Sequence, residues 1–299
     1  MNTQAKLLLF GEHIIIQGAN ALAYPWDAYQ AEWRFGKEAT SDKEDASLQN
    51  WLAYLKELQK TDGGWLALDL DRFEQDLQDG LYFHSNIPRG YGAGSSGALC
   101  AGLFKRYRLQ TAALSFSELK EQFGKMESFF HGSSSGTDPL ICYLNRSLLI
   151  QKSLDITLVE LDLQQLPKPY QLFVLNTGIE RQTEPWVNYF LRQAANPNFQ
   201  GQMNSTLIPA SNQAIQALLN YDGSQLFQQM AHISKFQYEH LREMIPETFH
   251  NIWATGLADN SDFKLKLCGA GGGGFILGLS RDPKALTKLQ KAYTLLTLQ

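Results

Sequence analysis

Apolar and polar residues near the start of the chain alternate in short runs, as they do in β-strands. Residues 6–24 predict short strands with turns at Gly11 and Gly18, and the β-branched run Ile14–Ile16 favours the extended conformation. Another strand is expected at 80–87, directly before a stretch that is rich in glycine. The N-terminal pattern is therefore one of short strands and tight turns.

Longer polar and helical stretches lie between and after these strands. The run 36–48 is highly charged and predicts a surface loop, whereas apolar residues recur at helical spacing in 47–60. Ser115 and Glu118 have the spacing of a capping box, so a helix is expected to begin there and to continue to residue 132.

The glycine-rich stretch is followed by an apolar run with helical periodicity. A helix is expected over 95–109, with Leu99, Leu103 and Phe104 directed toward the core. The predicted order at this point is thus strand, glycine-rich loop, helix, and then the second helix that begins near Ser115.

The second half of the chain repeats the combination of strands and helices. Pro167 and Pro169 indicate a boundary between a domain at 1–166 and a domain at 167–299. Residues after 205 have mostly helical spacing until 264–280, which predicts a strand, a glycine turn and a strand. Further strands are expected at 147–153, 156–161 and 170–178.

Composition excludes several classes of protein. The 299 residues, 44% of them hydrophobic and 19% charged, suit two globular domains with a sizeable core. A net charge of −4 argues against nucleic acid or an anionic membrane as the main partner. No stretch reaches the roughly 20 apolar residues of a membrane span. The three cysteines are far apart and no signal-peptide pattern is present, so free thiols and a cytoplasmic location are expected.

Glycines gather in the sequence IPRGYGAGSSGALC, residues 87–100, and glycine is favoured where the backbone turns tightly or approaches another group. The span Gly92–Gly97 matches G-x-G-x-x-G, but a second helix follows where a dinucleotide fold needs a strand. No Gly-Lys-Ser/Thr ends the run, which excludes a P-loop. Two interpretations remain: a tight turn packed on another segment, and a phosphate site at a helix N-terminus with Ser95 and Ser96 adding hydroxyls.

Charged residues in apolar surroundings provide two further candidate groups. Lys6, Glu12 and His13 flank or interrupt apolar runs, and they must be paired, face a cleft or mark the solvated end of an edge strand. Glu127 and Asp138 lie near one Ser/Gly loop, where two carboxylates would suit Mg²⁺ binding and activation of an alcohol. The alternative for Asp138 is a capping role in a polar turn.

A second glycine cluster lies between two apolar segments. Gly269 and Gly271–Gly274 form a turn in which side chains are disfavoured, and a flexible hairpin loop is the alternative interpretation. Two glycine-rich loops in one chain favour a shared ligand with little tolerance for side chains.

In combination, these segments resemble motifs of the GHMP kinase superfamily. Its first motif is similar to KLLLFGEHIIIQG at 6–18, its second to Pro88–Gly97 and its third to Lys266–Gly274. A fourth block, a helical Glu followed by His-Gly-x-x-Ser-Gly-x-Asp, is similar to Glu127–Asp138. The four motifs occur in the order of the family over nearly the whole chain.

Two segments resemble the mevalonate kinases in particular. These are the Phe-Gly-Glu-His signature followed by ALAYP at 21–25, and NTGIERQT at 176–183, which also resembles phosphomevalonate kinases. The resemblance implies the α+β GHMP kinase fold, with an N-terminal ribosomal-protein-S5-domain-2-like domain and a C-terminal ferredoxin-like domain. It implies ATP and Mg²⁺ as cofactors. The implied reaction phosphorylates the primary hydroxyl of mevalonate to 5-phosphomevalonate, for isoprenoid synthesis.

The resemblance also implies roles for single residues. Asp138 would accept the proton of the hydroxyl and Lys6 would hold both Asp138 and the γ-phosphate, while Ser96 and Glu127 would ligate Mg²⁺. The implied acceptor-binding residues are Glu12, His13 and Thr183. The implied ATP-binding residues are Pro88, Gly90, Gly92, Ala93, Gly94, Ser95, Ser96, Gly97, Gly271, Gly272 and Gly273.

Three positions depart from the family pattern. Ala93, Gly97 and Cys268 stand where the family usually has Leu, Ala and Thr, and all three keep a small or apolar character, so phosphate binding is still expected. Two other functions stay open: a GHMP kinase for phosphomevalonate or a sugar, and a sensor that has the fold but no activity. The sequence also leaves open whether the chain forms a homodimer.

Overall fold

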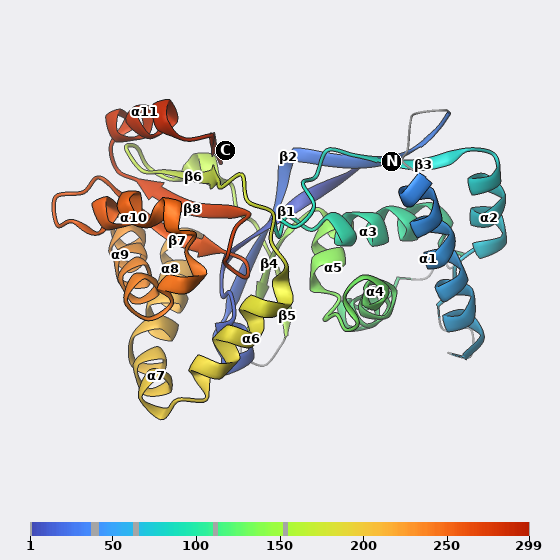
Figure 1. Ribbon diagram of the computed structural model, residues 1–299, viewed down its shortest axis with the longest axis horizontal. Coiled ribbons are helices and arrows are strands. Elements are labelled where there is room, and N and C mark those ends of the chain that lie inside the picture. Colours follow the sequence, from blue (N-terminus) through green and yellow to red (C-terminus); the bar gives the residue numbers. More distant parts are fainter. Residues whose placement is uncertain (1, 37–41, 62–65, 110–112, 152–154, 299) are drawn as a thin grey trace. The chain divides into compact units, whose positions relative to one another are not determined.

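The chain forms two compact units, which are visible in the computed structural model in Figure 1. The structure describes residues 2–36, 42–61, 66–109, 113–151 and 155–298. The first unit comprises residues 1–6, 25–88 and 93–146, and the second comprises residues 7–24, 89–92 and 147–299. Each unit thus combines separate stretches of the chain. The expected domain boundary between 166 and 167 stays a prediction.

The first unit combines antiparallel strands with a group of helices. Helix α3 packs against α4 and α5, and α1 packs against α2 and α4 (Figure 1). Strand β2 pairs with β3 from Ala31 opposite Ser85 to Phe35 opposite Leu81. The elements with residues in this unit are β1 (Asn2–Phe10), β2 (Ala21–Phe35), α1 (Asp42–Thr61), α2 (Leu70–Gln78), β3 (Leu81–Ser85), α3 (Ser95–Tyr107), α4 (Phe116–His131) and α5 (Thr137–Leu144).

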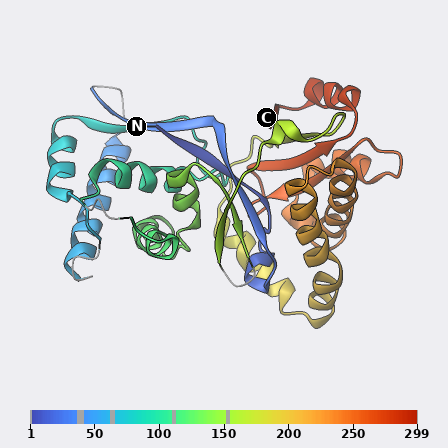
Figure 2. The same ribbon diagram turned by 180° about the vertical axis from the view of Figure 1, so that it is seen from behind.

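The second unit contains the start of β2, paired with a hairpin, and a separate four-stranded sheet of order β7-β8-β6-β9. Helices α9 and α10 pack on β7, and α8 runs beside α9 (Figure 2). The elements are η1 (Ile14–Gln17), β4 (Ser147–Ile150), β5 (Ile156–Val159), η2 (Leu163–Gln165), β6 (Gln171–Asn176), α6 (Thr183–Ala194), α7 (Pro197–Gln202), η3 (Met203–Leu207), α8 (Ile208–Leu219), α9 (Gly223–His240), η4 (Arg242–Met244), η5 (Glu247–Phe249), α10 (His250–Leu257), β7 (Phe263–Cys268), β8 (Phe275–Ser280), α11 (Pro283–Ala292) and β9 (Leu295–Thr297).

Antiparallel sheets with helices packed on them confirm the predicted α+β class. Local predictions were confirmed where the signal was a cap or a glycine turn. Ser115 and Glu118 form the expected capping box at the start of α4. Strands β7 and β8 pair on either side of the second glycine cluster, from Phe263 opposite Ser280 to Cys268 opposite Phe275.

The β-branched run Ile14–Ile16 is not a strand, contrary to the sequence prediction, but part of the 3₁₀ helix η1. Gly11 and Gly18 have φ angles of 102° and 84°, and the N–H of Gly18 donates to the carbonyl of Ile15. The N–H groups of Ile14 and Ile15 donate to the carbonyls of Glu12 and Gly11, so local turn bonds replace the ladder of a strand. The geometry of the turns therefore overrides the β-propensity of isoleucine.

Part of the charged run at 36–48 is helical, contrary to the predicted loop. Residues 37–41 lie outside the described residues, and α1 begins at Asp42. Lysine and glutamate are good helix formers, so a charged segment can form the first turns of a helix. In α3, Leu103 and Phe104 are buried as expected, whereas Leu99 is half-buried.

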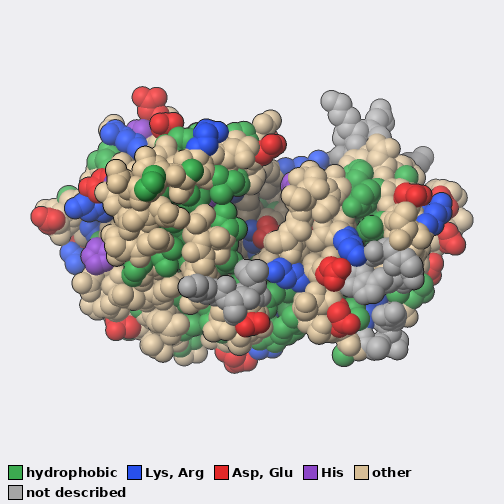
Figure 3. Space-filling view, turned by 90° about the horizontal axis from the view of Figure 1, so that it is seen from below, with side chains coloured by type: hydrophobic (Ala, Val, Ile, Leu, Met, Phe, Trp, Pro, Cys, Tyr) green, Lys and Arg blue, Asp and Glu red, His purple; other side chains and the backbone are tan. Residues whose placement is uncertain are grey.

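The described charged side chains are mixed in sign on the face shown in Figure 3, where Lys and Arg alternate with Asp and Glu. Among the helices that the structure describes, none is both long enough and apolar enough to span a bilayer.

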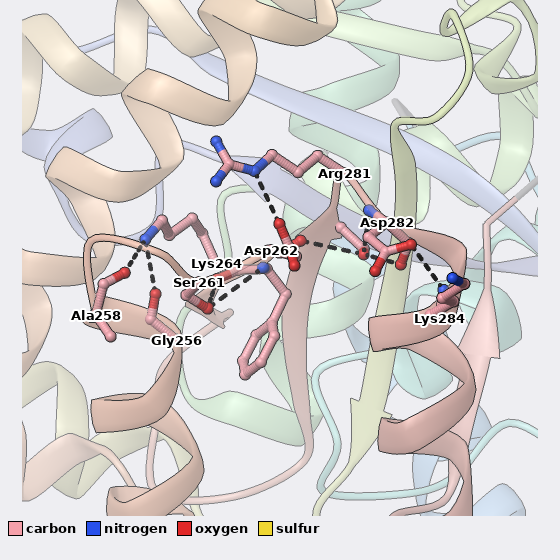
Figure 4. Close-up of polar contacts among 10 residues, drawn as sticks. Gly256, Ala258, Ser261, Asp262, Lys264, Arg281, Asp282 and Lys284 are labelled. Carbon is pink, nitrogen blue, oxygen red and sulfur yellow. Dashed lines mark hydrogen bonds and ion pairs between the residues drawn. The ribbon is translucent and has the colours of Figure 1, made fainter.

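A buried lysine caps the end of a helix in the second unit. Lys264 Nζ donates to the carbonyls of Gly256 and Ala258, at 2.8 and 3.3 Å, where α10 ends (Figure 4). The last carbonyls of a helix lack partners within it and favour a cation. Burial lowers the pKa of Lys264, and the charge of Arg281 adds to the effect. The neighbouring Arg281 is held by Asp262, with 3.2 Å between Nε and Oδ1.

Lys264→Met is expected to lower the free energy of unfolding by about 1–2 kcal/mol, because the terminal carbonyls of α10 lose a charged donor. Urea denaturation would measure the change. Lys284→Met is the matched control, since Lys284 is exposed at the start of α11 (Figure 4) and its loss should change stability by less than about 0.5 kcal/mol. Equal effects of the two substitutions would contradict the capping role.

Candidate functional site

An ion pair joins the first strand to helix α5 within the first unit. Lys6 Nζ lies 2.7 Å from Asp138 Oδ2, and the exposed fractions of the two side chains are 7% and 40%. The ammonium is therefore buried beneath a carboxylate that still reaches solvent. The backbone N–H of Lys6 donates to the carbonyl of Ala93 at 2.9 Å, which ties β1 to the first glycine-rich loop. This arrangement holds a carboxylate, which can accept a proton or a hydrogen bond, next to a fixed positive charge.

Two glycines of the first loop make room for this pair. Gly94 has a φ of 80° and precedes the first turn of α3, and a Cβ there would stand 2.8 Å from Lys6 Cγ. A Cβ at Gly97 would stand 2.9 Å from the Asp138 carbonyl carbon and from Pro139 N. The departure from the family pattern at Gly97 thus has a physical reason in this chain, because alanine would press on the start of α5.

Helix α3 begins without a side-chain cap. Its N-cap residue is Gly94, which offers no side-chain acceptor for the first N–H groups of the helix. Such groups, together with the helix dipole, attract anions and phosphates in particular. Ser95 and Ser96 are the first two residues of the helix and are both half-buried. The geometry therefore fits the phosphate interpretation of the loop.

A hydrogen-bonded cluster surrounds Glu127 on α4. Ser96 Oγ donates to Glu127 Oε1 at 2.8 Å, and Ser134 Oγ donates to Oε2. His131 Nε2 lies 3.0 Å from Ser96 Oγ. Glu127 is 4% exposed, so the cluster brings a buried carboxylate to the N-terminus of α3.

The environment of Glu127 favours a nearby cation. Burial raises the pKa of Glu127 to about 7, and the negative charge of Asp138 adds to the rise, although Ser134, Ser96 and Lys6 oppose it. Because burial disfavours the ionised form of this carboxylate, a metal ion bound beside it would stabilise that form. Mg²⁺ is usually held by one or two carboxylates together with phosphate oxygens. Ser96 and Glu127 fit such a site. In the described ranges, no cluster of three or more His, Cys, Asp or Glu is arranged to hold a metal by itself.

A second buried ion pair lies within the second unit. Lys266 Nζ is 2.6 Å from Glu12 Oε1, and the two side chains are 2% and 5% exposed. The same ammonium donates to the carbonyl of Leu267 at 2.6 Å and lies 5.4 Å from the centre of the Phe10 ring. Burial raises the pKa of Glu12 even though Lys266 lowers it. The pair fixes the segment after β1 to the strand that leads into the second glycine cluster.

His13 is held against the second glycine cluster. Its Nε2 lies 3.2 Å from the carbonyl oxygen of Ala270, and its ring stacks on Phe190 with 4.8 Å between the ring centres. The backbone of His13 has a φ of 61°, which is unusual for a residue with a side chain. Burial lowers the pKa of His13 to about 4, and the charges of Arg181 and Lys266 act in the same direction. The imidazole is therefore neutral at pH 7, with Nε2–H as the donor to Ala270.

The low pKa of His13 predicts a pH dependence of stability. Between pH 4 and 6.5 the folded state binds fewer protons at His13 than the unfolded state does. The contribution of His13 to the free energy of unfolding is therefore complete above its ordinary pKa of 6.5, and it is lost as the pH falls to about 4. Relative to His13→Gln, the wild type should lose on the order of 3 kcal/mol over this range. Glutamine keeps an N–H donor for Ala270 but does not titrate. Urea unfolding at several pH values measures the difference, and parallel curves would contradict the prediction.

Arg181 joins the two glycine-rich stretches in the second unit, and sequence reasoning did not select it. Its Nη1 donates to the carbonyl of Gly271 and its backbone N–H donates to the carbonyl of Gly90, both at 3.2 Å. A Cβ at Gly92 or Gly269 would stand 2.1 or 2.5 Å from Nη2. The available signal was an arginine within NTGIERQT, two residues before the selected Thr183. The glycines thus make room for a buried guanidinium.

The remaining selected residues fall into the same two units. Residues 89–92 of the first loop belong to the second unit and residues 93–97 to the first. Thr183 is exposed at the start of α6, and Gly272 packs against Trp186, where a Cβ would be 1.8 Å from the indole nitrogen. The first unit therefore brings together Lys6, Ser96, Glu127 and Asp138. The second unit brings together Glu12, His13, Gly90, Gly92 and Gly271–Gly273 around Lys266 and Arg181.

Comparison with known proteins gives a consistent result. Residues 55–146 match the family described as GHMP kinases N terminal domain. An L. major mevalonate kinase in complex with R-mevalonate is 19% identical, with a TM-score of 0.64, over 97% of this chain and 90% of that one. No curated protein matches the chain in sequence at a significant level.

Kinases with other acceptors have similar folds. A Streptococcus pneumoniae phosphomevalonate kinase in complex with phosphomevalonate and AMPPNP is 16% identical, with a TM-score of 0.64, over 97% of this chain and 94% of that one. A Lactococcus lactis galactokinase complexed with galactose is 14% identical, with a TM-score of 0.64, over 100% and 92%. At these identities the likeness establishes the fold and leaves the acceptor open. Residues 55–146 thus match the N-terminal domain family of the GHMP kinases, and the chain has the fold of these kinases.

Proposed function

We propose that this chain is a mevalonate kinase, which transfers the γ-phosphoryl group of ATP to the primary hydroxyl of mevalonate and produces 5-phosphomevalonate for isoprenoid synthesis. The observation that carries the proposal is the Lys6–Asp138 pair, 2.7 Å apart beside the uncapped N-terminus of α3. A proton acceptor, a fixed cation and a phosphate-binding helix end are the groups that phosphoryl transfer to an alcohol requires.

In this proposal Asp138 accepts the proton of the substrate hydroxyl. The hydroxyl oxygen then forms a bond to the γ-phosphorus, and the bond between that phosphorus and the leaving oxygen of ADP breaks. Lys6 holds the Asp138 carboxylate in position and stabilises charge on the transferring group. Because the Asp138 side chain is 40% exposed and that of Lys6 only 7%, the carboxylate can reach a substrate while the ammonium is shielded from solvent. Phosphoryl transfer depends mainly on such positioning and charge stabilisation.

Ser96 and Glu127 would hold Mg²⁺, and the N–H groups at the start of α3 would bind phosphate oxygens. When bound, the metal supplies charge neutralisation between the phosphates. The first loop, Pro88–Gly97, would follow the phosphate chain, because its glycines and Ala93 leave the backbone open to contact. Gly271–Gly273 would bind phosphate oxygens through their backbone, with Arg181 fixing the loop that carries them.

Residues of the second unit would serve the acceptor side. His13 is neutral and donates through Nε2 to Ala270, so its Nδ1 can accept a hydrogen bond from a hydroxyl. Glu12 would act through Lys266, which it holds at 2.6 Å, and Thr183 offers an exposed hydroxyl at the start of α6. The mevalonate assignment within the superfamily is supported by the Phe-Gly-Glu-His signature and the ALAYP segment.

A coupled ADP-release assay with Mg·ATP tests the proposal, with mevalonate, phosphomevalonate and galactose as separate acceptors. We expect turnover with mevalonate and much slower turnover with the other two. Turnover of phosphomevalonate or galactose in place of mevalonate would show a different kinase of the superfamily. Nucleotide binding without turnover of any of the acceptors would favour the non-catalytic sensor.

A further inference from the structure

A histidine outside the selected site residues contacts the hydroxyl of Ser96. His131 is the last residue of α4, and its Nε2 lies 3.0 Å from Ser96 Oγ. The helix ends there because Gly132 adopts a φ of 73°, with its N–H donating to the carbonyl of Ser128 at 2.8 Å. The end of α4 is thus fixed in a position that places the imidazole at the start of α3.

The direction of the hydrogen bonds around Ser96 follows from the groups involved. A hydroxyl has one hydrogen, and Ser96 donates it to Glu127 Oε1 at 2.8 Å. Because that hydrogen is directed to Glu127, Ser96 can only accept from His131, and Nε2–H of His131 is the donor. One lone pair of the Ser96 oxygen then accepts from the imidazole, and one stays available for a cation.

The hydrogen-bond partners of Glu127 limit the orientations that its carboxylate can adopt. Ser134 donates to the other carboxylate oxygen, Oε2, and Glu127 is 4% exposed, so the carboxylate has little freedom to rotate. A serine hydroxyl held at one bond only could still swing about its Cα–Cβ bond. A second bond, from His131, restricts that rotation and directs the remaining lone pair of Ser96.

We infer that His131 is a positioning residue that orients the Ser96 hydroxyl for the metal ion bound with the nucleotide. The inference rests on the proposed function and adds a residue that acts through Ser96. His131 donates a hydrogen bond to the ligand oxygen and takes no part in proton transfer to the substrate. Groups that orient metal ligands in this way affect metal affinity or activity by about 10- to 100-fold.

Two substitutions at one position separate the donor role from a structural one. His131→Leu removes the donor, and His131→Gln retains an N–H in reach of Ser96. For His131→Leu we expect about tenfold weaker binding of Mg·AMPPNP by titration calorimetry, a similar rise in KM for Mg·ATP and an unchanged KM for the acceptor. His131→Gln should restore most of the affinity. Thermal unfolding of both variants checks that they fold.

A double-mutant cycle with Ser96→Ala tests whether His131 acts through that hydroxyl. If it does, Ser96→Ala/His131→Leu should bind Mg·AMPPNP no more weakly than Ser96→Ala, because the partner is already lost. Additive losses would overturn the inference, as would unaltered binding by a folded His131→Leu variant or equal losses in the Leu and Gln variants. Failure of the wild type to bind Mg·AMPPNP would instead refute the proposed function, so the two failures are distinguishable.

Discussion

Asp138→Asn is expected to lower kcat by about 10²- to 10⁴-fold, because an amide cannot accept the proton of the substrate hydroxyl. Binding of Mg·ATP should largely survive, since the N-terminus of α3, Ser96 and Glu127 are unchanged. Asparagine is nearly the same size, so the contacts of Gly97 with the start of α5 are kept. Loss of kcat with retained nucleotide affinity would show that the carboxylate acts in the transfer step.

The measurement combines steady-state kinetics with calorimetry of Mg·AMPPNP binding. Asp27→Asn is a matched control, because Asp27 is an exposed aspartate of β2 in the same unit. It should leave kcat within about twofold of the wild type. An unchanged kcat in Asp138→Asn would remove the residue from its proposed role. A loss of nucleotide binding equal to the loss of kcat would assign Asp138 to binding.

Glu12→Gln is expected to lower the free energy of unfolding by about 3–5 kcal/mol, because it leaves the Lys266 ammonium buried without its carboxylate. Lys266 is 2% exposed and its Nζ lies 2.6 Å from Glu12 Oε1, so water cannot replace the lost partner easily. The raised pKa of Glu12 shows that burial outweighs the attraction of Lys266 for that carboxyl. The cost of Glu12→Gln is therefore mainly that of an uncompensated charge.

The double variant Glu12→Gln/Lys266→Met separates these contributions. Removing the ammonium as well should restore most of the lost stability, since replacing a buried pair with neutral groups is often neutral or stabilising. Urea unfolding of wild type, both single variants and the double variant completes the cycle. Glu184→Gln, at an exposed position of α6, should have an effect of less than about 0.5 kcal/mol. A double variant as unstable as Glu12→Gln would contradict this explanation.

Local elements were predictable where a few neighbouring residues determine the backbone. The capping box at Ser115 fixes the start of α4, and the glycines between two apolar runs fix the turn from β7 to β8. The run Ile14–Ile16 was predicted wrongly because the N–H groups of Ile14 and Ile15 bond to carbonyls of the same turn and not to a neighbouring strand. The charged run at 36–48 gave no signal that separates a loop from the first turns of a helix.

The residues of the proposed site were selected from motifs, and only some of their contacts followed from the sequence. Lys6 and Asp138 were selected together from motifs, and the structure brings their charges within 2.7 Å. Arg181 was not selected, since one arginine in a polar segment has no distinctive pattern, and His131 was noted only as part of the fourth motif, without a role. Their contacts with Gly271 and Ser96 depend on segments that lie 90 and 35 residues away.

The sequence by itself determined the α+β class, the order of the motifs and the chemical groups available for phosphoryl transfer. Tertiary structure decided which charges are buried and which partner each one has, as for Glu12 and Lys266, which are 254 residues apart. The physical reason is that helices, caps and turns depend on neighbouring residues. The cost of burying a charge depends on the groups that surround it after the chain has folded.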